Sequence, residues 1–222
     1  MIPHTQLKGV FVERGKRLQI ATKTIVPESV YGERLVQEGK DTYRIWDPKK
    51  SKLGAAIMKG VSQIGIRPGS KVLYLGCASG TTASHVSDIV GNEGFVYGLD
   101  FSPRVLRDFM FVVEKRKNML PIFADANKPE TYKQYIGDVD VVFQDVAQKN
   151  QVEIFLKNVN FFLKSGGFGL LAIKARSIDV TKNPQVVFRE VKQQLERNVT
   201  IVDYRSLEPF ERDHAIFIVK KK

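Results

Sequence analysis

Residues 71–82 have the sequence KVLYLGCASGTT, and this stretch decides the fold. Residues 72–75 are an apolar run with no polar face, which is typical of a strand buried on both sides in a parallel sheet. A turn of small residues, 76–80, follows, and Thr81 and Thr82 open a segment with a helical pattern. Strand, glycine turn and helix in this order bring the backbone N–H groups of a helix N-terminus up to a ligand. We therefore expect a doubly wound α/β sheet with a ligand site after this strand.

The composition excludes several classes of protein. The chain has 222 residues, enough for one sizeable α/β core with a small appendage. One Cys and three scattered His exclude a disulfide framework and a zinc cluster of recognisable spacing, so we expect no metal site and a reducing cytoplasm. The first residues lack the apolar core of a signal peptide, and no apolar run approaches the ~18 residues that cross a bilayer.

The net charge of +11 points to a polyanionic partner, most often a nucleic acid. Lys and Arg are spread along the chain rather than gathered in a tail, which favours a basic face over a basic arm. Plain solubility is the alternative explanation of this charge.

Residues 1–50 are predicted to form a small β domain made of two hairpins. The turns of these hairpins are Arg14–Lys16 and Glu38–Asp41, the second of which contains Gly39. Trp46 ends the last strand, and we expect it in the core or at the domain junction. The paired segments are 9–13 with 17–21, and 33–37 with 42–46.

A helix is predicted after Asp47-Pro48, because apolar residues recur there at helical spacing. The apolar residues on its one face are Leu53, Ile57, Val61 and Ile64. Lys49, Lys50 and Lys52 gather at its start, where positive charge opposes the helix macrodipole. Helix physics does not explain these lysines, so they indicate either a solvated face or a site that faces an anion.

Residues 51–222 are predicted to form the second domain, in which strands and helices alternate. Ser102 and Pro103 are predicted to start one of its helices, and Asn183-Pro184 to cap the last. The final two strands, near 199–206 and 213–219, are expected to pair antiparallel. The other predicted strands are 94–100, 119–125, 140–145 and 168–175, the last entered through Gly166-Gly167, and the predicted helices are 82–90, 103–117, 129–135, 150–163 and 184–197.

Polar residues stand at the C-terminal ends of several of these strands, which is the edge where such sheets bind ligands. Asp100, Asp125, Asp145 and Lys174 each follow an apolar run. One such acid is unremarkable, because Asp is common in turns. Three acids at the ends of successive strands indicate a site at this edge.

The glycine turn has the pattern G-x-A-x-G, formed by Gly76, Ala78 and Gly80. The third glycine of a dinucleotide fingerprint is missing, and no lysine occupies the position that a phosphate-binding P-loop needs. An acid 20 residues after Gly80, Asp100, completes the pattern of S-adenosylmethionine enzymes. Metal and dinucleotide chemistry are therefore not expected.

Each residue of this pattern has a physical role toward S-adenosylmethionine. Asp100 can accept both hydroxyls of the ribose, and Asp125 can accept the adenine amino group beside the small Ala126. The amides and hydroxyls of Thr81 and Thr82 can meet the methionine carboxylate at the helix N-terminus.

A catalytic set is predicted from Lys52, Asp145, Lys174 and His214, although each has an ordinary alternative as a surface, turn or strand residue. Lys174 follows mostly apolar residues, so we expect it to be partly desolvated. Desolvation and a second nearby ammonium would lower the pKa of a lysine, which could then remove a proton from a hydroxyl. Asp145 would orient Lys174.

At these residues the chain resembles the fibrillarin family of RNA-guided 2′-O-methyltransferases. The resemblance implies a class I S-adenosylmethionine-dependent methyltransferase fold, with a seven-stranded, mostly parallel sheet and a small N-terminal β domain. It places a Lys-Asp-Lys-His set on the four residues above. The family often has Glu where this chain has Asp100. The segments that carry the resemblance are YGERLVQEGKDTYRIWDPKKSKLGAAI, VLYLGCASGTTASHVSDIVG, FSPRVLR, QDVAQ, IKARSIDVT and EPFERDHAIF. The cofactor contacts that it implies are Thr81, Thr82, Asp100, Phe101, Asp125, Ala126, Asp145, Val146, Ala147 and Gln148.

The resemblance also implies a reaction and partners. The 2′-oxygen of rRNA or tRNA attacks the sulfonium methyl, and a C/D box guide RNA chooses the nucleotide. A Nop-family scaffold protein and a kink-turn-binding ribosomal-type protein complete the particle. The glycine-arginine-rich extension of eukaryotic members is absent here, which suggests the archaeal, cytoplasmic type. A methyltransferase for protein glutamine or a small molecule, and a non-catalytic binding module, are the alternatives.

Overall fold

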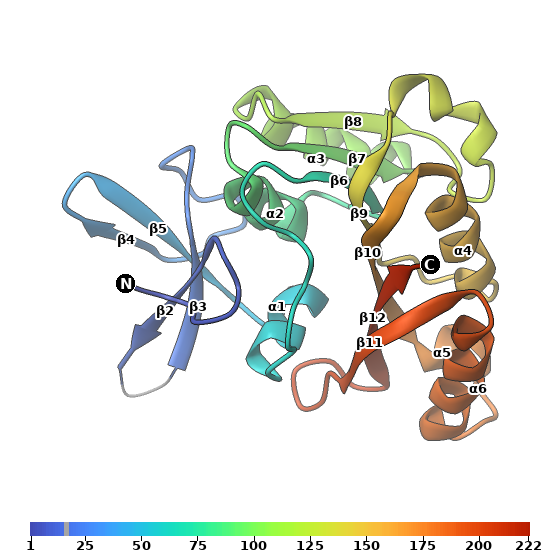
Figure 1. Ribbon diagram of the computed structural model, residues 1–222. Coiled ribbons are helices and arrows are strands. Elements are labelled where there is room, and N and C mark those ends of the chain that lie inside the picture. The colour runs from blue at the N-terminus through green and yellow to red at the C-terminus, as the bar shows by residue number, and fades with distance from the viewer. Residues whose placement is uncertain (16–17) are drawn as a thin grey trace.

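The computed structural model describes residues 1–15 and 18–222, which form two β-sheets (Figure 1). The smaller sheet is antiparallel, has five strands in the order β1-β2-β3-β5-β4, and confirms both predicted hairpins. Lys16, the last residue of the first predicted turn, and Arg17, the first residue of the strand predicted after it, lie outside the described residues. The strands of this sheet are β1 (Ile2–Pro3), β2 (Val10–Arg14), β3 (Leu18–Lys23), β4 (Leu35–Glu38) and β5 (Asp41–Trp46).

The larger sheet has seven strands in the order β11-β12-β10-β9-β6-β7-β8. Neighbours from β8 to β10 pair parallel, whereas β12 is antiparallel to both β10 and β11. The pairing of β11 with β12 confirms the antiparallel pair predicted for the final two strands. This is the seven-stranded, mostly parallel sheet that the family resemblance implies. Its strands are β6 (Lys71–Leu75), β7 (Phe95–Asp100), β8 (Met119–Phe123), β9 (Val139–Gln144), β10 (Leu163–Lys174), β11 (Val199–Ser206) and β12 (His214–Lys221).

Helices cover both faces of the larger sheet. Val72 and Tyr74 of β6 pack into a core shared with the first three helices, while Leu73 and Leu75 pack into a second core shared with the last three. The apolar run of β6 is therefore buried on both sides, which explains why it has no polar face. The helices are α1 (Lys52–Met58), α2 (Thr81–Val90), α3 (Pro103–Glu114), α4 (Gln151–Phe162), α5 (Ala175–Ile178), α6 (Pro184–Glu196) and the 3-10 turns η1 (Pro129–Thr131) and η2 (Lys133–Tyr135). Within the described residues, no helix is long and apolar enough to span a membrane.

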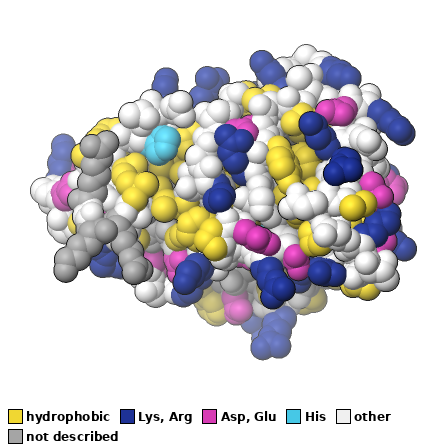
Figure 2. All heavy atoms as spheres, turned by 90° about the horizontal axis from the view of Figure 1, so that it is seen from below, with side chains coloured by type: hydrophobic (Ala, Val, Ile, Leu, Met, Phe, Trp, Pro, Cys, Tyr) yellow, Lys and Arg dark blue, Asp and Glu magenta, His cyan; other side chains and the backbone are white. Residues whose placement is uncertain are grey.

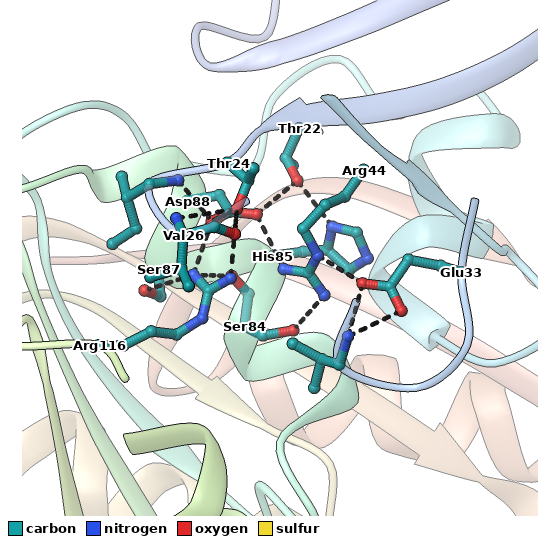
Figure 3. Close-up of polar contacts among 12 residues, drawn as sticks. Thr22, Thr24, Val26, Glu33, Arg44, Ser84, His85, Ser87, Asp88 and Arg116 are labelled. Carbon is teal, nitrogen blue, oxygen red and sulfur yellow. Dashed lines mark hydrogen bonds and ion pairs between the residues drawn. The ribbon is translucent and has the colours of Figure 1, made fainter. Parts of the chain in front are cut away.

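A buried junction joins the smaller sheet to α2. Trp46, at the end of β5, stacks on His85 of α2 with 4.5 Å between ring centroids, which confirms its predicted place. Arg44 of β5 donates to Asp88 and Ser84 of α2 (Figure 3). Arg116, just after α3, donates to the other oxygen of Asp88. The predicted domain boundary at residue 50 falls between β5 and α1 and stays a prediction.

The helix predicted from the spacing of Leu53 to Ile64 is correct only in its first half. α1 ends at Met58, and Gly60 has a φ of +72°, which turns the chain away from the helix. Val61 and Ile64 are nevertheless buried in the same core, because the following loop folds back onto it. Apolar residues at helical spacing are therefore buried here by a loop and not by a helix.

Other boundaries also differ from the prediction. Gly166-Gly167 lies inside β10, at a shift of register against β9, so the strand begins earlier than predicted. Ser102 stands at the N-cap of α3, as predicted, but its side chain makes no capping hydrogen bond, and α3 ends at Glu114. The helix predicted near residues 129–135 is two 3-10 turns, and α5 was not predicted.

Candidate active site

The register of the central strands brings three predicted site residues side by side. Leu75 of β6 pairs with Leu99 of β7 and with Gln144 of β9. The residues that follow these three in the chain are Gly76, Asp100 and Asp145, respectively. The glycine turn and two of the three acids are therefore neighbours at one edge of the sheet.

The glycine turn is shaped by close contacts that only glycine allows. Gly76 has a φ of +77°, and a Cβ there would lie 2.5 Å from the carbonyl oxygen of Asp145. Gly80 has a φ of +91°, and a Cβ there would lie 2.6 Å from the Phe109 ring. Gly80 is also the N-cap of α2 and carries no capping side chain, so the first N–H groups of α2 stay available to a ligand.

Two acids are held by backbone amides at this edge of the sheet. Asp100 accepts from the Ala78 amide (3.1 Å) and the Ser102 amide (2.9 Å), one on each carboxylate oxygen. Asp125 lies two residues beyond β8, and its Oδ1 accepts from the amide of Asn127 at 2.9 Å. That hydrogen bond lowers the pKa of Asp125. Each carboxylate keeps lone pairs that a bound hydroxyl or amine can use.

Asn127 connects two segments predicted to bind the cofactor, and the sequence analysis missed it. Its side-chain amide donates to Asp125 and to Gln148, each at 3.1 Å. The carbonyl of Ala126 accepts from the side-chain amide of Asn158 at 2.9 Å, and this bond fixes the same loop to α4. The D-x-N pattern of residues 125–127 is the signal that could have identified Asn127, because an Asp side chain commonly bonds the amide two residues on.

The remaining predicted cofactor residues lie along the same edge. Phe101, directly after Asp100, is 62% exposed, so its ring is open to a planar ligand. Val146 and Gln148 are half-buried, and Ala147 is exposed.

Thr82 differs from what the sequence led us to expect. Its hydroxyl is buried and donates to the Ser51 hydroxyl at 2.9 Å, so this proton is already used inside the protein. Thr81 is half-buried. A ligand carboxylate can therefore meet the Thr81 side chain and the amides of α2, but not the proton of the Thr82 hydroxyl.

Lys52 and Asp145 form an ion pair at the edge of the sheet. The Lys52 Nζ lies 2.9 Å from Oδ1 and 3.0 Å from Oδ2 of Asp145, and each side chain is about one fifth exposed. Lys52 is the first residue of α1, and Asp145 directly follows β9. Residues separated by more than ninety positions in the chain are thus joined beside the glycine turn.

Lys174 and His214 face each other on neighbouring strands, since they pair in the register of β10 and β12. His214 is buried, its Nδ1 lies 2.6 Å from the Arg212 carbonyl, and burial lowers its pKa, an effect to which the charge of Lys52 adds. Lys174 is exposed, so the expected partial desolvation is not found. It is the last residue of β10, where the strand leaves the core.

The predicted contact between Lys174 and Asp145 is also missing. Within the described part of the chain, Asp145 pairs with Lys52, and Lys174 forms no ion pair. Asp145 therefore orients Lys52 in this structure, and Lys174 stands free at the same edge.

This donor set fits S-adenosylmethionine. The glycine turn leaves space where a Cβ would collide, and the N-terminus of α2 attracts a carboxylate. Asp100 ends β7 and Asp125 follows the neighbouring strand β8, and each carboxylate is fixed by a backbone amide at the edge where such sheets bind ligands. Among the described residues, no group of His, Cys, Asp or Glu is arranged to hold a metal ion.

Comparisons with known proteins agree with this geometry. The family model described as Fibrillarin matches residues 1–222. The chain is 54% identical to a fibrillarin-like rRNA/tRNA 2′-O-methyltransferase of Thermococcus onnurineus, over 96% of this chain and 94% of that protein. It is 45% identical to Aeropyrum pernix fibrillarin, solved with natively bound S-adenosyl-L-methionine, with a TM-score of 0.91 over 98% and 96% of the two chains.

A second solved structure, a complex of fibrillarin with Nop5p, matches with a TM-score of 0.89 at 40% identity, over 97% of this chain and 99% of that one. The family match spans the whole chain, and the two solved structures share its fold almost from end to end. On these grounds the chain belongs to the fibrillarin family.

Proposed function

We propose that this chain is an S-adenosylmethionine-dependent RNA 2′-O-methyltransferase that acts on rRNA and tRNA. The observation that carries the proposal is the Lys52–Asp145 ion pair, which lies directly beside the glycine turn. A relative at 54% identity is named as an enzyme of this activity, and a family member was solved with the cofactor bound.

The cofactor supplies a methyl group on a sulfonium, which is already activated for transfer. We assign the ribose hydroxyls to Asp100 and the adenine amino group to the loop that carries Asp125 and Ala126, with Phe101 against the ring. Thr81 and the amides of α2 hold the carboxylate. The main-chain segment 145–148 closes the site on the β9 side.

The protein residues act on the RNA hydroxyl. We assign the general base to Lys174, which is exposed at the edge in the free chain. RNA bound over it would remove its amine from water, which favours the neutral form that can take the proton of the attacking 2′-hydroxyl. The Lys52–Asp145 pair holds the hydroxyl in line by offering it a donor and an acceptor within one rigid unit. His214, buried and neutral, supports the strand that presents Lys174. The 2′-hydroxyl occurs in RNA and not in DNA, so the reaction itself selects RNA.

We further propose that the chain works as the catalytic subunit of a C/D box guide ribonucleoprotein. A Nop-family scaffold is supported by the solved complex of a family member with Nop5p. Guide RNA and a kink-turn-binding protein are added from the family resemblance, as is a cytoplasmic location of the archaeal type. Lys and Arg side chains are dispersed over the face in Figure 2, between apolar and acidic ones, which suits contact with RNA backbone more than sequence readout.

The test is reconstitution with guide RNA, partner proteins and labelled cofactor, followed by mapping of alkali-resistant dinucleotides. Lys174→Ala should lose transfer by at least about 100-fold, the usual contribution of a general base, while cofactor binding is retained. Lys164→Ala is the matched control, because Lys164 lies at the opposite end of the same strand. Transfer by Lys174→Ala at the wild-type rate would contradict the assignment of the base, and label found only on protein would contradict the RNA substrate.

A further inference from the structure

Ser51 connects the glycine turn to Lys52. It is buried and forms the N-cap of α1, where its Oγ accepts from the Gly54 amide at 3.1 Å. The same Oγ accepts from the Thr82 hydroxyl at 2.9 Å. One hydroxyl therefore has two hydrogen bonds, one within α1 and one to α2.

The two helices that meet at Ser51 carry different parts of the site. Thr82 lies in the first turn of α2, directly after the turn assigned to the methyl donor. Lys52, the residue after Ser51, is the first residue of α1 and holds Asp145. The bond between Thr82 and Ser51 is thus a direct connection from the donor-binding segment to the ion pair.

We propose that Ser51 is a positioning residue that sets Lys52, and through it Asp145, at the correct place relative to the glycine turn. The inference rests on the proposed function of Lys52 and Asp145. Ser51 does not itself touch substrate, because its side chain is buried.

The first turn of α1 is buried in the apolar core, but it has few polar contacts besides this cap. It contains no acidic residue, and Lys52 opposes the macrodipole there. α1 is only seven residues long, so it depends on tertiary contacts. The Trp46 ring packs closely on Gly54, where a Cβ would lie 2.9 Å from its Nε1, and this anchors the opposite side of the turn. Without the Ser51 hydroxyl, the first turn of α1 would lose its side-chain cap and its bond to α2, so the backbone that carries Lys52 would be held less firmly at the edge.

Ser51→Ala in the reconstituted particle tests the proposal. A displacement of about 1 Å at a reacting group can reduce a rate by up to ~100-fold, so we expect the single-turnover rate at saturating cofactor and RNA to fall about tenfold or more. The cofactor affinity, measured by calorimetry on the free protein, should stay within about twofold, because the amides of α2 remain in place. Thr82→Val keeps the cap of α1 and removes only the donor, and it should reduce the rate in the same way. The double variant should be no slower than Ser51→Ala alone, because Ser51→Ala already lacks the bond that Thr82→Val removes.

Asn183→Ala separates positioning from a general loss of helix capping. Asn183 is the N-cap of α6 and accepts from the Gln185 amide at 2.9 Å, but α6 carries none of the proposed site residues. This variant should lower the melting temperature yet keep the transfer rate. In the free protein, Lys52 should react faster with a reductive methylation reagent in Ser51→Ala than in the wild type or in Asn183→Ala.

The outcomes are distinct. If the wild-type particle methylates RNA and both Ser51→Ala and Thr82→Val transfer at its rate, the positioning role is wrong and the proposed function stands. If the wild-type particle does not methylate RNA, the proposed function itself fails. If Ser51→Ala does not fold, Thr82→Val alone decides, because its helix cap is intact.

Discussion

Replacing Asp88 by Asn should remove the negative charge that two buried arginines share. Arg44 approaches one oxygen of Asp88 at 2.9 Å and Arg116 approaches the other at 2.6 Å, and all three side chains are buried (Figure 3). Glu33 provides a second anion, which pairs with Arg44. The cluster is therefore neutral as it stands, and Asn would leave it with a net charge of +1.

The expected loss is about 3–5 kcal/mol, the range for breaking a buried ion pair by removing one partner. Arg44 retains Glu33, whereas the only ion-pair partner of Arg116 in the described residues is Asp88. Packing does not explain the loss, because Asn has nearly the shape of Asp. The Thr22 and Thr24 hydroxyls and the Ile25 amide also donate to Asp88. The NH₂ group of an Asn at this position would face these donors. For a chain of this size, at about 2–4 °C per kcal/mol, the melting temperature should fall by roughly 6–20 °C.

Equilibrium unfolding in guanidinium, followed by circular dichroism, measures this loss. Asp41→Asn is the matched control, because Asp41 forms a partly exposed pair with Lys23 on the same small sheet and should cost less than about 1 kcal/mol. Adding Arg116→Met to Asp88→Asn should recover part of the loss by removing the unpaired charge. A loss in Asp88→Asn as small as in Asp41→Asn, or no recovery in the double variant, would refute the view that charge balance holds this junction.

Three further outcomes are expected. Gly76→Ala should weaken cofactor binding and lower the melting temperature more than Gly39→Ala does. Both positions have positive φ, but a Cβ on Gly76 would meet the Asp145 carbonyl, whereas a Cβ on Gly39 would meet open space. Equal effects of the two variants in calorimetry and in melting would contradict this steric argument. Burial lowers the pKa of His85 and His214, so each binds its proton more weakly in the folded than in the unfolded chain. The stability that these residues contribute should be complete above about pH 6.5 and should decrease as the pH falls below it. His85→Gln should make this decrease smaller, as measured by guanidinium unfolding midpoints between about pH 7 and 5. The isolated chain should bind RNA weakly, with an affinity that falls linearly on a log–log plot against salt, and tight sequence-specific binding would contradict a guide-dependent enzyme.

The sequence predicted the sheet and the edge of the site because both depend on one simple geometric rule. Each parallel strand is an apolar run, and the residue after it reaches the same edge. Knowing that Leu75 ends one run was therefore enough to expect Gly76 beside Asp100 and Asp145, which the register confirms.

The features that the sequence could not predict depend on tertiary contacts between side chains that are far apart in the sequence. The spacing of Val61 and Ile64 is the same whether a helix or a returning loop buries them, and only Gly60 distinguishes the two. The hydroxyl of Thr82 could serve a ligand or Ser51, and the choice is made by where α1 packs. In the same way, the exposure of Lys174 depends on what stands beyond the end of β10, about which the strand's own residues say nothing.

Lys52 shows how a conflict at the local level can locate a site. A lysine in the first turn of a helix loses roughly 0.3–1 kcal/mol against the macrodipole, so the cluster of lysines before α1 had no local reason. The structure supplies separate reasons for two of them. Lys50 lies 5.4 Å from the centre of the Tyr31 ring, a cation–π contact, while Lys52 is paired with both oxygens of Asp145. The unfavourable position on the helix is offset by a partner from the far end of another strand, and that partner is at the edge where the glycine turn opens. A residue that contradicts local propensity and is satisfied only by a distant charge is where function is to be sought, and here that criterion selects Lys52 from the three lysines at the start of α1.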